Sequence, residues 1–291
     1  MKQLLILSGK GGTGKTTIAS SFIKLSQSKV YGDCDVDAPN LHLIRGKEFP
    51  VLEEKDYYAM PKAAINKSLC VGCGKCRTNC RFHAIEKKEN GFEVNQFACE
   101  GCGVCSFVCP EKAVSLEPVV AGKLKLYKKT DEVFSTAKLK IGSGTSGKLV
   151  AAVKKQMLDT KMETPVAIID GSPGIGCPVI SSLSGVDMVL IVAEPSMSGI
   201  SDMERIIKTA GVFGTRAVVC VNKFDTNLDK TNEIIEFCEK HKIPFVGKVP
   251  FDKEAVKAVN KGMTVVETDC ISGNAIKQVF ENTMTILKPA I

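Results

Sequence analysis

A glycine-rich stretch near the start of the chain has the residue types that hold a phosphate group. Residues 9–16, Gly-Lys-Gly-Gly-Thr-Gly-Lys-Thr, match the pattern G-x-x-x-x-G-K-[ST]. Backbone N–H groups of such a loop surround an anion, its lysine contacts the β- and γ-phosphates, and its hydroxyl binds Mg²⁺. Lys15 and Thr16 occupy these last two positions. The nucleotide-binding residues that we expect here are Gly9, Lys10, Gly11, Gly12, Thr13, Gly14, Lys15, Thr16 and Thr17.

Aspartates follow two other apolar stretches. Asp33 and Asp35 come directly after a short strand expected near residues 30–31, and Asp170 ends the apolar run 166–169. A buried strand that ends in an aspartate is the Walker B pattern, which delivers a carboxylate to the Mg²⁺ shell. The carboxyl ends of parallel strands face the crevice in which such sheets bind ligands. The sequence therefore predicts that Asp170 serves the same site as the glycine-rich loop.

Eight of the thirteen cysteines fall in two runs of identical spacing, C-x-x-C-x-x-C-x-x-x-C. The spacing resembles that of bacterial two-cluster ferredoxins, in which the fourth cysteine of each run ligates the other cluster. The resemblance implies one [4Fe–4S] cluster on Cys70, Cys73, Cys76 and Cys109, and a second on Cys99, Cys102, Cys105 and Cys80. Arg81 stands where these ferredoxins usually have proline after the fourth cysteine. Zinc is the alternative, but its sites usually take two cysteine pairs separated by a longer loop.

Residues 10–17, KGGTGKTT, resemble the deviant Walker A loop of the MinD and Mrp group of ATPases. In that group the additional lysine reaches across a dimer interface to the nucleotide of the other subunit. The resemblance implies a homodimer and a role in trans for Lys10, for which a solvated loop lysine is the alternative. It also implies that Asp35 orients or activates the attacking water and that Asp33 lies near Mg²⁺ through water. Residues 171–174, Gly-Ser-Pro-Gly, resemble the switch region of the group.

Residues 221–225, Val-Asn-Lys-Phe-Asp, help to predict whether the bound nucleotide carries guanine or adenine. N-K-x-D is the guanine-reading motif of GTPases, whereas in the MinD and Mrp group the corresponding asparagine contacts adenine. Because the loop and the aspartates resemble that group, we expect ATP, contacted by Asn222, Asp225 and Pro250. GTP is the alternative.

Five cysteines lie outside the two runs. Cys177 has an offset from Asp170 similar to that of a cluster-ligating cysteine in the nitrogenase iron protein, a member of the same group. Because the sequence shows no second cysteine between residues 110 and 176, we predict a buried free thiol at Cys177. The same structural interpretation applies to Cys34, Cys220, Cys238 and Cys270.

These motifs need an α/β framework to bring them together. Apolar runs at 4–7, 166–169, 188–193, 217–221 and 243–249 predict buried strands, separated by helix-length segments such as 17–25, 147–157 and 273–287. A further strand is expected over 121–127. The pattern predicts a P-loop NTPase fold with a mainly parallel sheet flanked by helices, plus a small inserted α+β ferredoxin-like domain. The expected ranges are 1–62 and 119–291 for the two parts of the ATPase domain and 63–118 for the insert.

Composition excludes several other classes of protein. No apolar run approaches the roughly 20 residues of a membrane-spanning helix, and the start of the chain lacks a signal-peptide pattern. Cysteines without an export signal favour reduced thiols and a cytoplasmic protein. The net charge of +7 comes from dispersed lysines, with 6% aromatic residues and no tryptophan, so a nucleic-acid partner is not indicated.

The expected cofactors are therefore ATP, Mg²⁺ and two [4Fe–4S] clusters. Our first hypothesis is an ATPase of slow or partner-dependent turnover that couples nucleotide state to electron transfer through the clusters. The alternatives are an ATP-dependent iron–sulfur assembly or carrier protein, and a MinD-like regulatory or positioning switch with redox-sensing clusters. The partner would be a redox protein or a cluster-acceptor protein, which the sequence does not identify.

Overall fold

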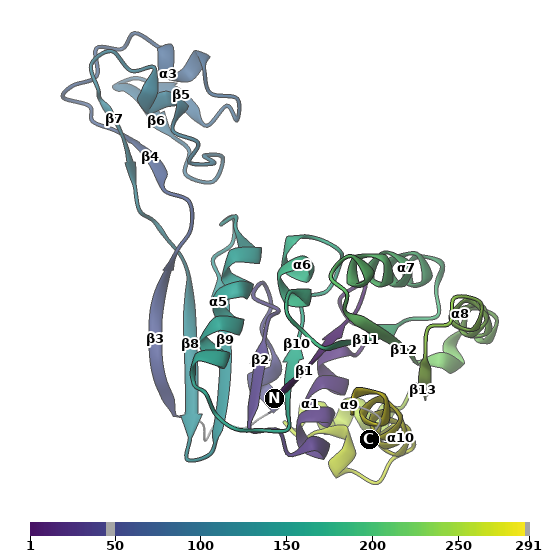
Figure 1. The fold of residues 1–291 in the computed structure, drawn as a ribbon. Helices are drawn as coiled ribbons and strands as arrows, with labels where there is room; N and C mark the ends of the chain where they lie inside the picture. The colour runs from purple at the N-terminus through teal and green to yellow at the C-terminus, as the bar shows by residue number, and fades with distance from the viewer. Residues whose placement is uncertain (45–49, 289–291) are drawn as a thin grey trace. The chain divides into compact units, whose positions relative to one another are not determined.

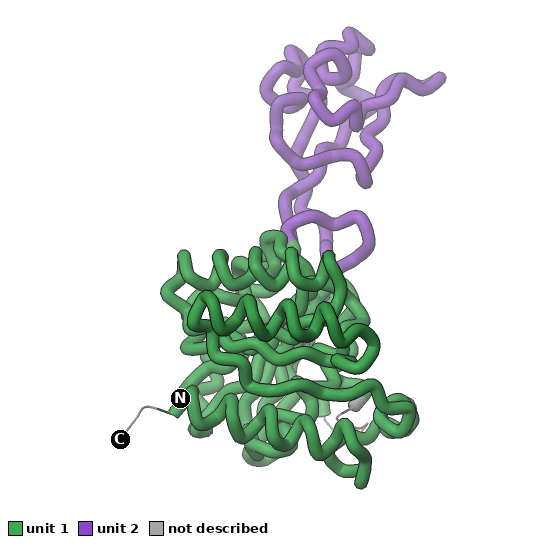
Figure 2. Tube along the Cα trace, turned by 90° about the vertical axis from the view of Figure 1, so that its right-hand side faces the viewer, with its two compact units in different colours: residues 1–54, 124–138, 146–291 green, residues 55–123, 139–145 purple. Residues whose placement is uncertain are grey.

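The computed structural model describes residues 1–44 and 50–288, which form two compact units (Figure 2). The large unit comprises Met1–Glu54, Leu124–Lys138 and Ser146–Ile291. The small unit comprises Lys55–Lys123 and Leu139–Thr145, so it contains the whole of the range 63–118 and extends beyond it. The chain therefore passes from one unit to the other four times.

A nine-stranded sheet forms the centre of the large unit (Figure 1). From one edge to the other its strands are β13 (Phe245–Val249), β12 (Arg216–Asn222), β11 (Met188–Ala193), β1 (Lys2–Leu7), β10 (Val166–Asp170), β2 (Val30–Asp33), β9 (Glu132–Leu139), β8 (Val120–Lys129) and β3 (Val51–Tyr58). The strands from β13 to β9 are parallel to their neighbours. Asp170 lies opposite Ile6 on one side and Asp33 on the other, so the carboxylates meet at one edge of the sheet.

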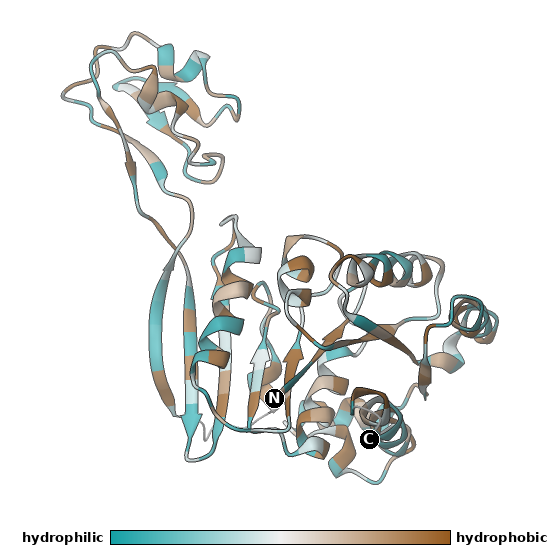
Figure 3. Ribbon diagram, viewed as in Figure 1, coloured by the Kyte–Doolittle hydropathy of each residue, from teal (hydrophilic) through white to brown (hydrophobic). Residues whose placement is uncertain are grey.

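Helices cover both faces of the parallel strands. On one face α1 (Lys15–Ser26) packs beside α10 (Ile271–Leu287), and on the other α5 (Ser146–Asp159) and α6 (Cys177–Leu183) lie side by side, followed by α7 (Met197–Val212) (Figure 1). The remaining helices of the large unit are α2 (Leu41–Ile44), α8 (Leu228–Lys240) and α9 (Lys253–Asn260). The hydropathy follows this arrangement, because β10 is apolar up to its last residue, Asp170, and β3 is mostly hydrophilic (Figure 3). The predicted mainly parallel sheet flanked by helices is confirmed.

Two strands of the nine-stranded sheet were not predicted from the sequence. β9 lies beside β2 with its middle residues buried, and β3 is mostly exposed at the sheet edge. Neither has the continuous apolar run that identifies the central strands. The predicted strand over 121–127 is confirmed as β8, and the helices expected at 17–25, 147–157 and 273–287 are confirmed as α1, α5 and α10.

The small unit repeats one pattern twice. Its elements are β4 (Lys62–Ile65), α3 (Lys75–Thr78), β5 (Ile85–Lys88), β6 (Gly91–Val94), α4 (Val104–Phe107) and β7 (Val114–Glu117). β4 pairs with β7 and β5 pairs with β6, both in antiparallel register. Within the described residues, no helix of either unit has both the length and the apolar character needed to cross a membrane.

Candidate functional site

The glycine-rich loop joins β1 to α1 and is held by close packing at two positions. Gly14 has a left-handed backbone (φ 90°) as the N-cap of α1, and an added Cβ there would lie 2.2 Å from Nδ2 of Asn222. A Cβ at Gly9 would lie 2.2 Å from Cβ of Asp202. Any side chain at these positions would displace its neighbour, so both glycines are required by the local geometry.

Lys15 and Asp170 form a buried ion pair at the centre of the site. Lys15 Nζ lies 2.6 Å from Asp170 Oδ1, and Thr16 Oγ1 donates to Asp170 Oδ2 at 2.7 Å. The Asp170 side chain is fully buried. Burial alone would lower the pKa of Lys15, but the adjacent Asp170 carboxylate raises it overall, so the lysine stays charged. The two residues predicted to meet phosphate and Mg²⁺ thus contact each other in the nucleotide-free chain.

Asp33 is also fully buried, but its carboxylate is occupied by the backbone. Oδ1 accepts from the N–H of Asp35, and Oδ2 accepts from the N–H groups of Asn40 and Leu41, each at 3.0 Å. Burial, followed by the charge of Asp170, raises the pKa of Asp33 to about 7. These contacts fix the course of residues 34–41, the segment that carries Asp35.

Asp35 points toward the same lysine. Its Oδ2 lies 4.0 Å from Lys15 Nζ, and burial raises the pKa of its carboxyl group. The sequence-predicted Lys15, Asp35 and Asp170 are therefore brought together by α1, by the segment after β2 and by the end of β10.

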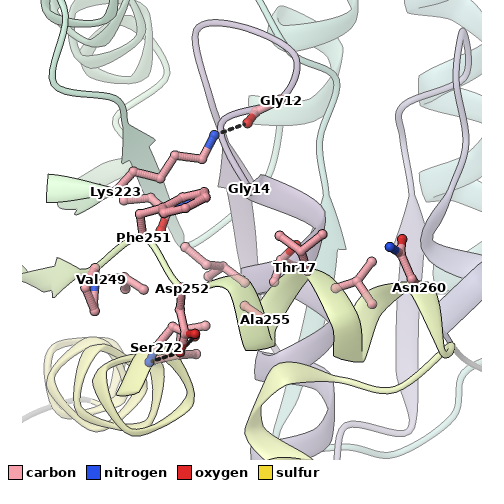
Figure 4. Close-up of a pocket in the computed structure, with 16 residues that line it drawn as sticks. Gly12, Gly14, Thr17, Lys223, Val249, Phe251, Asp252, Ala255, Asn260 and Ser272 are labelled. Carbon is pink, nitrogen blue, oxygen red and sulfur yellow. Dashed lines mark hydrogen bonds between the residues drawn. The ribbon is translucent and has the colours of Figure 1, made fainter. Parts of the chain in front are cut away.

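Two adjoining cavities open at this edge of the sheet and share Gly12, Gly14 and Thr17. One, of about 1090 Å³, is lined by the glycine-rich loop and Asp35. The other, of about 790 Å³, is lined by Asn222, Lys223 and residues 249–252, with apolar side chains of α9 and Ile276 of α10 (Figure 4). Together they provide one polar and one mostly apolar compartment, as a nucleotide requires.

The segment after β12 contacts the glycine-rich loop directly. Asn222 Nδ2 donates to Thr13 O at 2.6 Å, and Lys223 Nζ donates to Gly12 O at 2.9 Å (Figure 4). Sequence reasoning did not single out Lys223, although it lies inside the N-K-x-D motif. Pro250 lines the second cavity, whereas Asp225 is not among the lining residues and its Oδ1 accepts from the Phe251 N–H at 2.8 Å.

Lys10 is exposed, and its Nζ donates to Ser198 Oγ at the start of α7.

The segment between β10 and α6, which contains the switch-like residues 171–174, makes two hydrogen bonds to neighbouring segments. Gly174 N donates to Ser8 O at 3.0 Å, and Ser172 Oγ donates to Cys34 O at 2.6 Å. The segment between β10 and α6 is thus bonded both to the glycine-rich loop and to the residue before Asp35.

None of the thirteen cysteines, all of which lie within the described residues, forms a disulfide. The prediction that Cys177 is buried was wrong, because this residue starts α6 and its side chain is exposed. Cys34, Cys220, Cys238 and Cys270 are buried. Cys177 comes directly after the loop that ends at Gly176 and is the first residue of α6. Sequence alone does not show whether a thiol at the start of a helix faces the protein or the solvent.

Two further cavities lie within the small unit, and each is lined by four cysteines. The first, of about 340 Å³, is lined by Cys70, Cys73, Cys76 and Cys109. The second, of about 360 Å³, is lined by Cys99, Cys102, Cys105 and Cys80. Each cavity thus combines three cysteines of one run with the fourth cysteine of the other run.

The surroundings of the cysteines are repeated at an offset of 29 residues. Ala84 N donates to Cys80 Sγ and Ala113 N donates to Cys109 Sγ, both at 3.3 Å. Gly74 and Gly103, the N-caps of α3 and α4, have left-handed φ angles of 76° and 80°. The glycines let the backbone curve around each cavity, so that N–H groups can face sulfur.

In residues 1–44 and 50–288, no three His, Cys, Asp or Glu side chains converge as a single metal ion would require. This applies to the cysteine cavities and to the carboxylates near Lys15 alike.

Residues 4–265 match the family model described as CobQ/CobB/MinD/ParA nucleotide binding domain. A curated relative, Uncharacterized protein MJ0578 of Methanocaldococcus jannaschii, is 33% identical over 283 residues, covering 96% of this chain and 95% of that protein. The septum site-determining protein MinD of Bacillus subtilis is 29% identical over 270 residues, covering 89% of this chain and 80% of that protein. The solved structure of MinD complexed with Mg-ADP from Pyrococcus horikoshii has a TM-score of 0.56 at 15% identity, covering 99% of each chain.

Proposed function

The chain belongs to the CobQ/CobB/MinD/ParA family of nucleotide-binding domains, and we propose that it is an ATPase whose nucleotide state controls electron transfer through two iron–sulfur clusters. The observation that carries the proposal is the crossed arrangement of cysteines in a chain that also has a complete phosphate-binding loop. Neither half alone would explain why both are present in one polypeptide.

In the ATPase half, each residue around the glycine-rich loop has a separate role. Lys15 would contact the β- and γ-phosphates of a bound nucleotide, and Thr16 and Asp170, which are joined by a hydrogen bond, would hold Mg²⁺. Asp35 orients the attacking water, and Asp33 holds the backbone of residues 34–41 in place through its three N–H contacts. This positioning role is compatible with the contact to Mg²⁺ through water that the resemblance implied, since among the described residues Oδ1 of Asp33 accepts only the Asp35 N–H and keeps a further lone pair.

The base is adenine in our proposal. Asn222 lines the apolar cavity, where Pro250 and Phe251 form part of its wall. A guanine-reading aspartate would have to face the base, but Asp225 bonds to the Phe251 N–H instead. Lys10 extends from the exposed loop, and in a homodimer it would exchange Ser198 for a phosphate of the other protomer.

The residues of the small unit fit two [4Fe–4S] clusters. A cube binds each of its four thiolates to a different iron, so its ligands surround a cavity and need not converge on one point. The two cavities have this form, with four sulfurs around each, backbone N–H groups directed at Cys80 and Cys109, and otherwise mainly apolar walls. When bound, such clusters supply one-electron redox chemistry. The chain's own residues hold them, limit water access and donate hydrogen bonds that stabilise the thiolates.

The polypeptide itself offers a route for the coupling. α6 follows the switch-like segment and packs against α5, and a Cβ at Gly147 of α5 would lie only 3.1 Å from Cys177 O. The residues directly before α5, Leu139–Thr145, belong to the small unit. A shift of α6 on nucleotide exchange would therefore move α5 and, through the chain, residues Leu139–Thr145 of the small unit.

The experiment compares the clusters in different nucleotide states. Anaerobically reconstituted protein should contain about eight irons per chain. An Asp35→Ala variant should bind ATP without hydrolysing it. In this variant we expect ATP, compared with ADP, to shift the midpoint potential of the clusters or the association state of the chain. A Lys15→Ala variant, which keeps every cysteine, is the control and should show no response to ATP. Full iron content with no effect of nucleotide on either property would contradict the coupling.

The likeness to proteins named septum site-determining protein MinD favours a second candidate, a regulatory switch with redox-sensing clusters. In that case cluster oxidation would alter ATP turnover or dimerisation, but no electron would pass on to a partner protein. Stoichiometric oxidation of the reduced protein by an electron acceptor protein, timed by ATP, separates the two.

A further inference from the structure

The two halves of the small unit share a backbone but differ in charge on one surface. α3 carries Lys75 and Arg77, and Arg81 lies beyond the end of α3, directly after Cys80. The positions 29 residues later, on and after α4, are Val104, Ser106 and Pro110. We call Lys75, Arg77 and Arg81 the α3 surface. Since the two halves have equivalent geometry, this difference in charge is a property of the side chains and not of the fold.

The three cations of the α3 surface are exposed and available for a partner. Within the described part of the chain none of them forms an ion pair, whereas two other lysines of the same unit do. Those two pairs, Lys67 with Glu93 and Lys88 with Glu86, have distances of 2.6 and 2.7 Å. Three cations within residues 75–81 that form no ion pair give this segment a positive field, which attracts a negatively charged partner.

The α3 surface lies mainly beside the cavity of Cys70, although Arg81 follows Cys80 of the other cavity. Lys75 lines the cavity of Cys70, Cys73, Cys76 and Cys109, and Cys76 lies within α3 itself. Cys73 is exposed, so this cavity reaches the protein surface close to the cations. A redox centre held there would lie near any protein that docks on the α3 surface.

We propose that the α3 surface docks an acidic one-electron carrier protein, which exchanges electrons with the centre held by Cys70, Cys73, Cys76 and Cys109. The inference rests on the proposed function, since it requires that this cavity holds an iron–sulfur cluster. In the transfer, the reduced carrier loses one electron and the chain gains one, with no bond broken and no proton moved. The three cations take no part in the chemistry; they steer the acidic carrier and set its orientation.

A nucleic acid fits the α3 surface less well. Stable binding to a duplex usually draws on six to ten phosphate contacts, roughly twice or more what three cations supply. A nucleic acid would also gain nothing from the exposed Cys73 beside the cations.

The test uses the reconstituted full-length chain and an acidic [2Fe–2S] ferredoxin as the probe. The variant Lys75→Gln/Arg77→Gln/Arg81→Gln removes the α3 surface. The matched control Arg205→Gln/Lys208→Gln/Lys240→Gln removes three cations, exposed and without ion pairs among the described residues, from α7 and α8 of the large unit. Equilibrium binding of the oxidised probe is measured by calorimetry at low and high ionic strength, and electron transfer from the reduced probe by stopped flow.

We expect the α3 variant to weaken binding and slow the low-salt transfer by about tenfold, and the control to stay within about twofold of the parent chain. Raising the salt concentration should remove the difference between parent and variant. Reduction by dithionite, which needs no docking surface, should be equal in all three proteins.

The outcomes separate this inference from the proposed function. Iron well below about eight per chain in the parent protein would defeat the proposed clusters and the docking inference with them. Full iron and normal dithionite reduction, with probe binding unchanged in the α3 variant, would overturn the docking inference alone. Binding of a short DNA duplex that is tighter than probe binding and lost in the α3 variant would overturn it in favour of nucleic acid.

Discussion

Lys15 Nζ lies 2.6 Å from Asp170 Oδ1, so the lysine expected on phosphate and the aspartate expected on Mg²⁺ neutralise each other. The pair is buried, and Lys15 also lies near the carboxyl groups of Asp33 and Asp35. Nucleotide with its metal must break this contact and replace both partners at once, because leaving either charge buried and alone is costly. We therefore expect Mg²⁺ and nucleotide to bind together.

The first prediction concerns the stability of the nucleotide-free chain. Asp170→Asn removes the closest counter-charge of the buried Lys15 ammonium, leaving Asp35 at 4.0 Å, and should lower the free energy of unfolding of the large unit by about 3 kcal/mol. The control is Asp159→Asn, which removes an exposed partner of Lys155 at 2.6 Å and should cost below about 1 kcal/mol. Denaturant unfolding of both variants measures the difference, and equal losses would show that the buried pair does not stabilise the fold.

The second prediction concerns Lys10 and its partner Ser198. Lys10→Ala should lower ATP turnover about 100-fold or more, as expected for a charge supplied in trans, whereas Ser198→Ala should leave turnover unchanged. Mixing Lys10→Ala with Lys15→Ala protein gives the decisive measurement. One protomer then binds ATP and the other supplies the intact Lys10, so phosphate release should return. If neither protein alone nor the mixture is active, the lysine acts within its own protomer.

The third prediction concerns base selection. Asp225 accepts from the Phe251 N–H at 2.8 Å, so Asp225→Ala should loosen the loop at Pro250 and weaken ATP and GTP binding by the same factor. Asp225→Asn keeps an acceptor oxygen and should have almost no effect on the binding of either nucleotide. Competition titrations with both nucleotides measure the ratio. A selective loss of GTP binding in Asp225→Asn would identify the aspartate as a guanine reader.

The sequence predicted those parts of the structure that depend on residues close together in the chain. The runs at 166–169 and 188–193 are apolar throughout because those strands are covered on both faces, and their short length and β-branched composition identify them as strands. β9 was missed because it buries Ser135 and Thr136, and only tertiary contacts, such as the bond from Ser135 Oγ to Val153 O, make that tolerable.

The same distinction holds within the candidate site. Loop spacing placed Lys15 and Thr16, and the doubled cysteine run predicted which cysteines share a cavity. The three N–H contacts of Asp33 and the engagement of Asp225 depend on segments distant in sequence or on the exact course of a loop. No residue type or spacing encodes them, so they became visible only in three dimensions.

The fourth prediction concerns pH. The pKa of Asp33 is raised to about 7 in the folded chain, above the value of about 3.9 expected when unfolded. The folded state therefore holds a proton that the unfolded state has lost, so the contribution of Asp33 to stability is full below about pH 4 and is lost as pH rises toward 7. We expect nucleotide-free protein to lose stability between pH 5 and about 8.

Asp33→Asn isolates this contribution, because every other titrating group is shared by the two proteins. The wild-type chain should lose more stability than Asp33→Asn as pH rises from 5 to about 8. Unfolding is followed in denaturant at each pH. Parallel pH profiles would mean that Asp33 is already ionised in the folded chain.

The fifth prediction tests the crossed cysteines. Cys109 lines the cavity of Cys70, and Cys80 lines the cavity of Cys99. Substituting Cys109→Ser should therefore leave the same residual cluster spectrum as Cys70→Ser, and Cys80→Ser the same as Cys99→Ser. Each variant should keep about four of about eight irons.

Iron counting and electron paramagnetic resonance distinguish the two residual spectra, because Arg81 follows Cys80 but no charged residue directly follows Cys109. The positive charge should raise the reduction potential of the centre that Cys80 ligates, since it favours the more negative, reduced state. Cys177→Ser is the matched control and should keep all the iron, because this exposed thiol lies outside both cavities. If Cys80→Ser instead gave the spectrum of Cys70→Ser, each run would hold its own cluster and the crossing would be wrong.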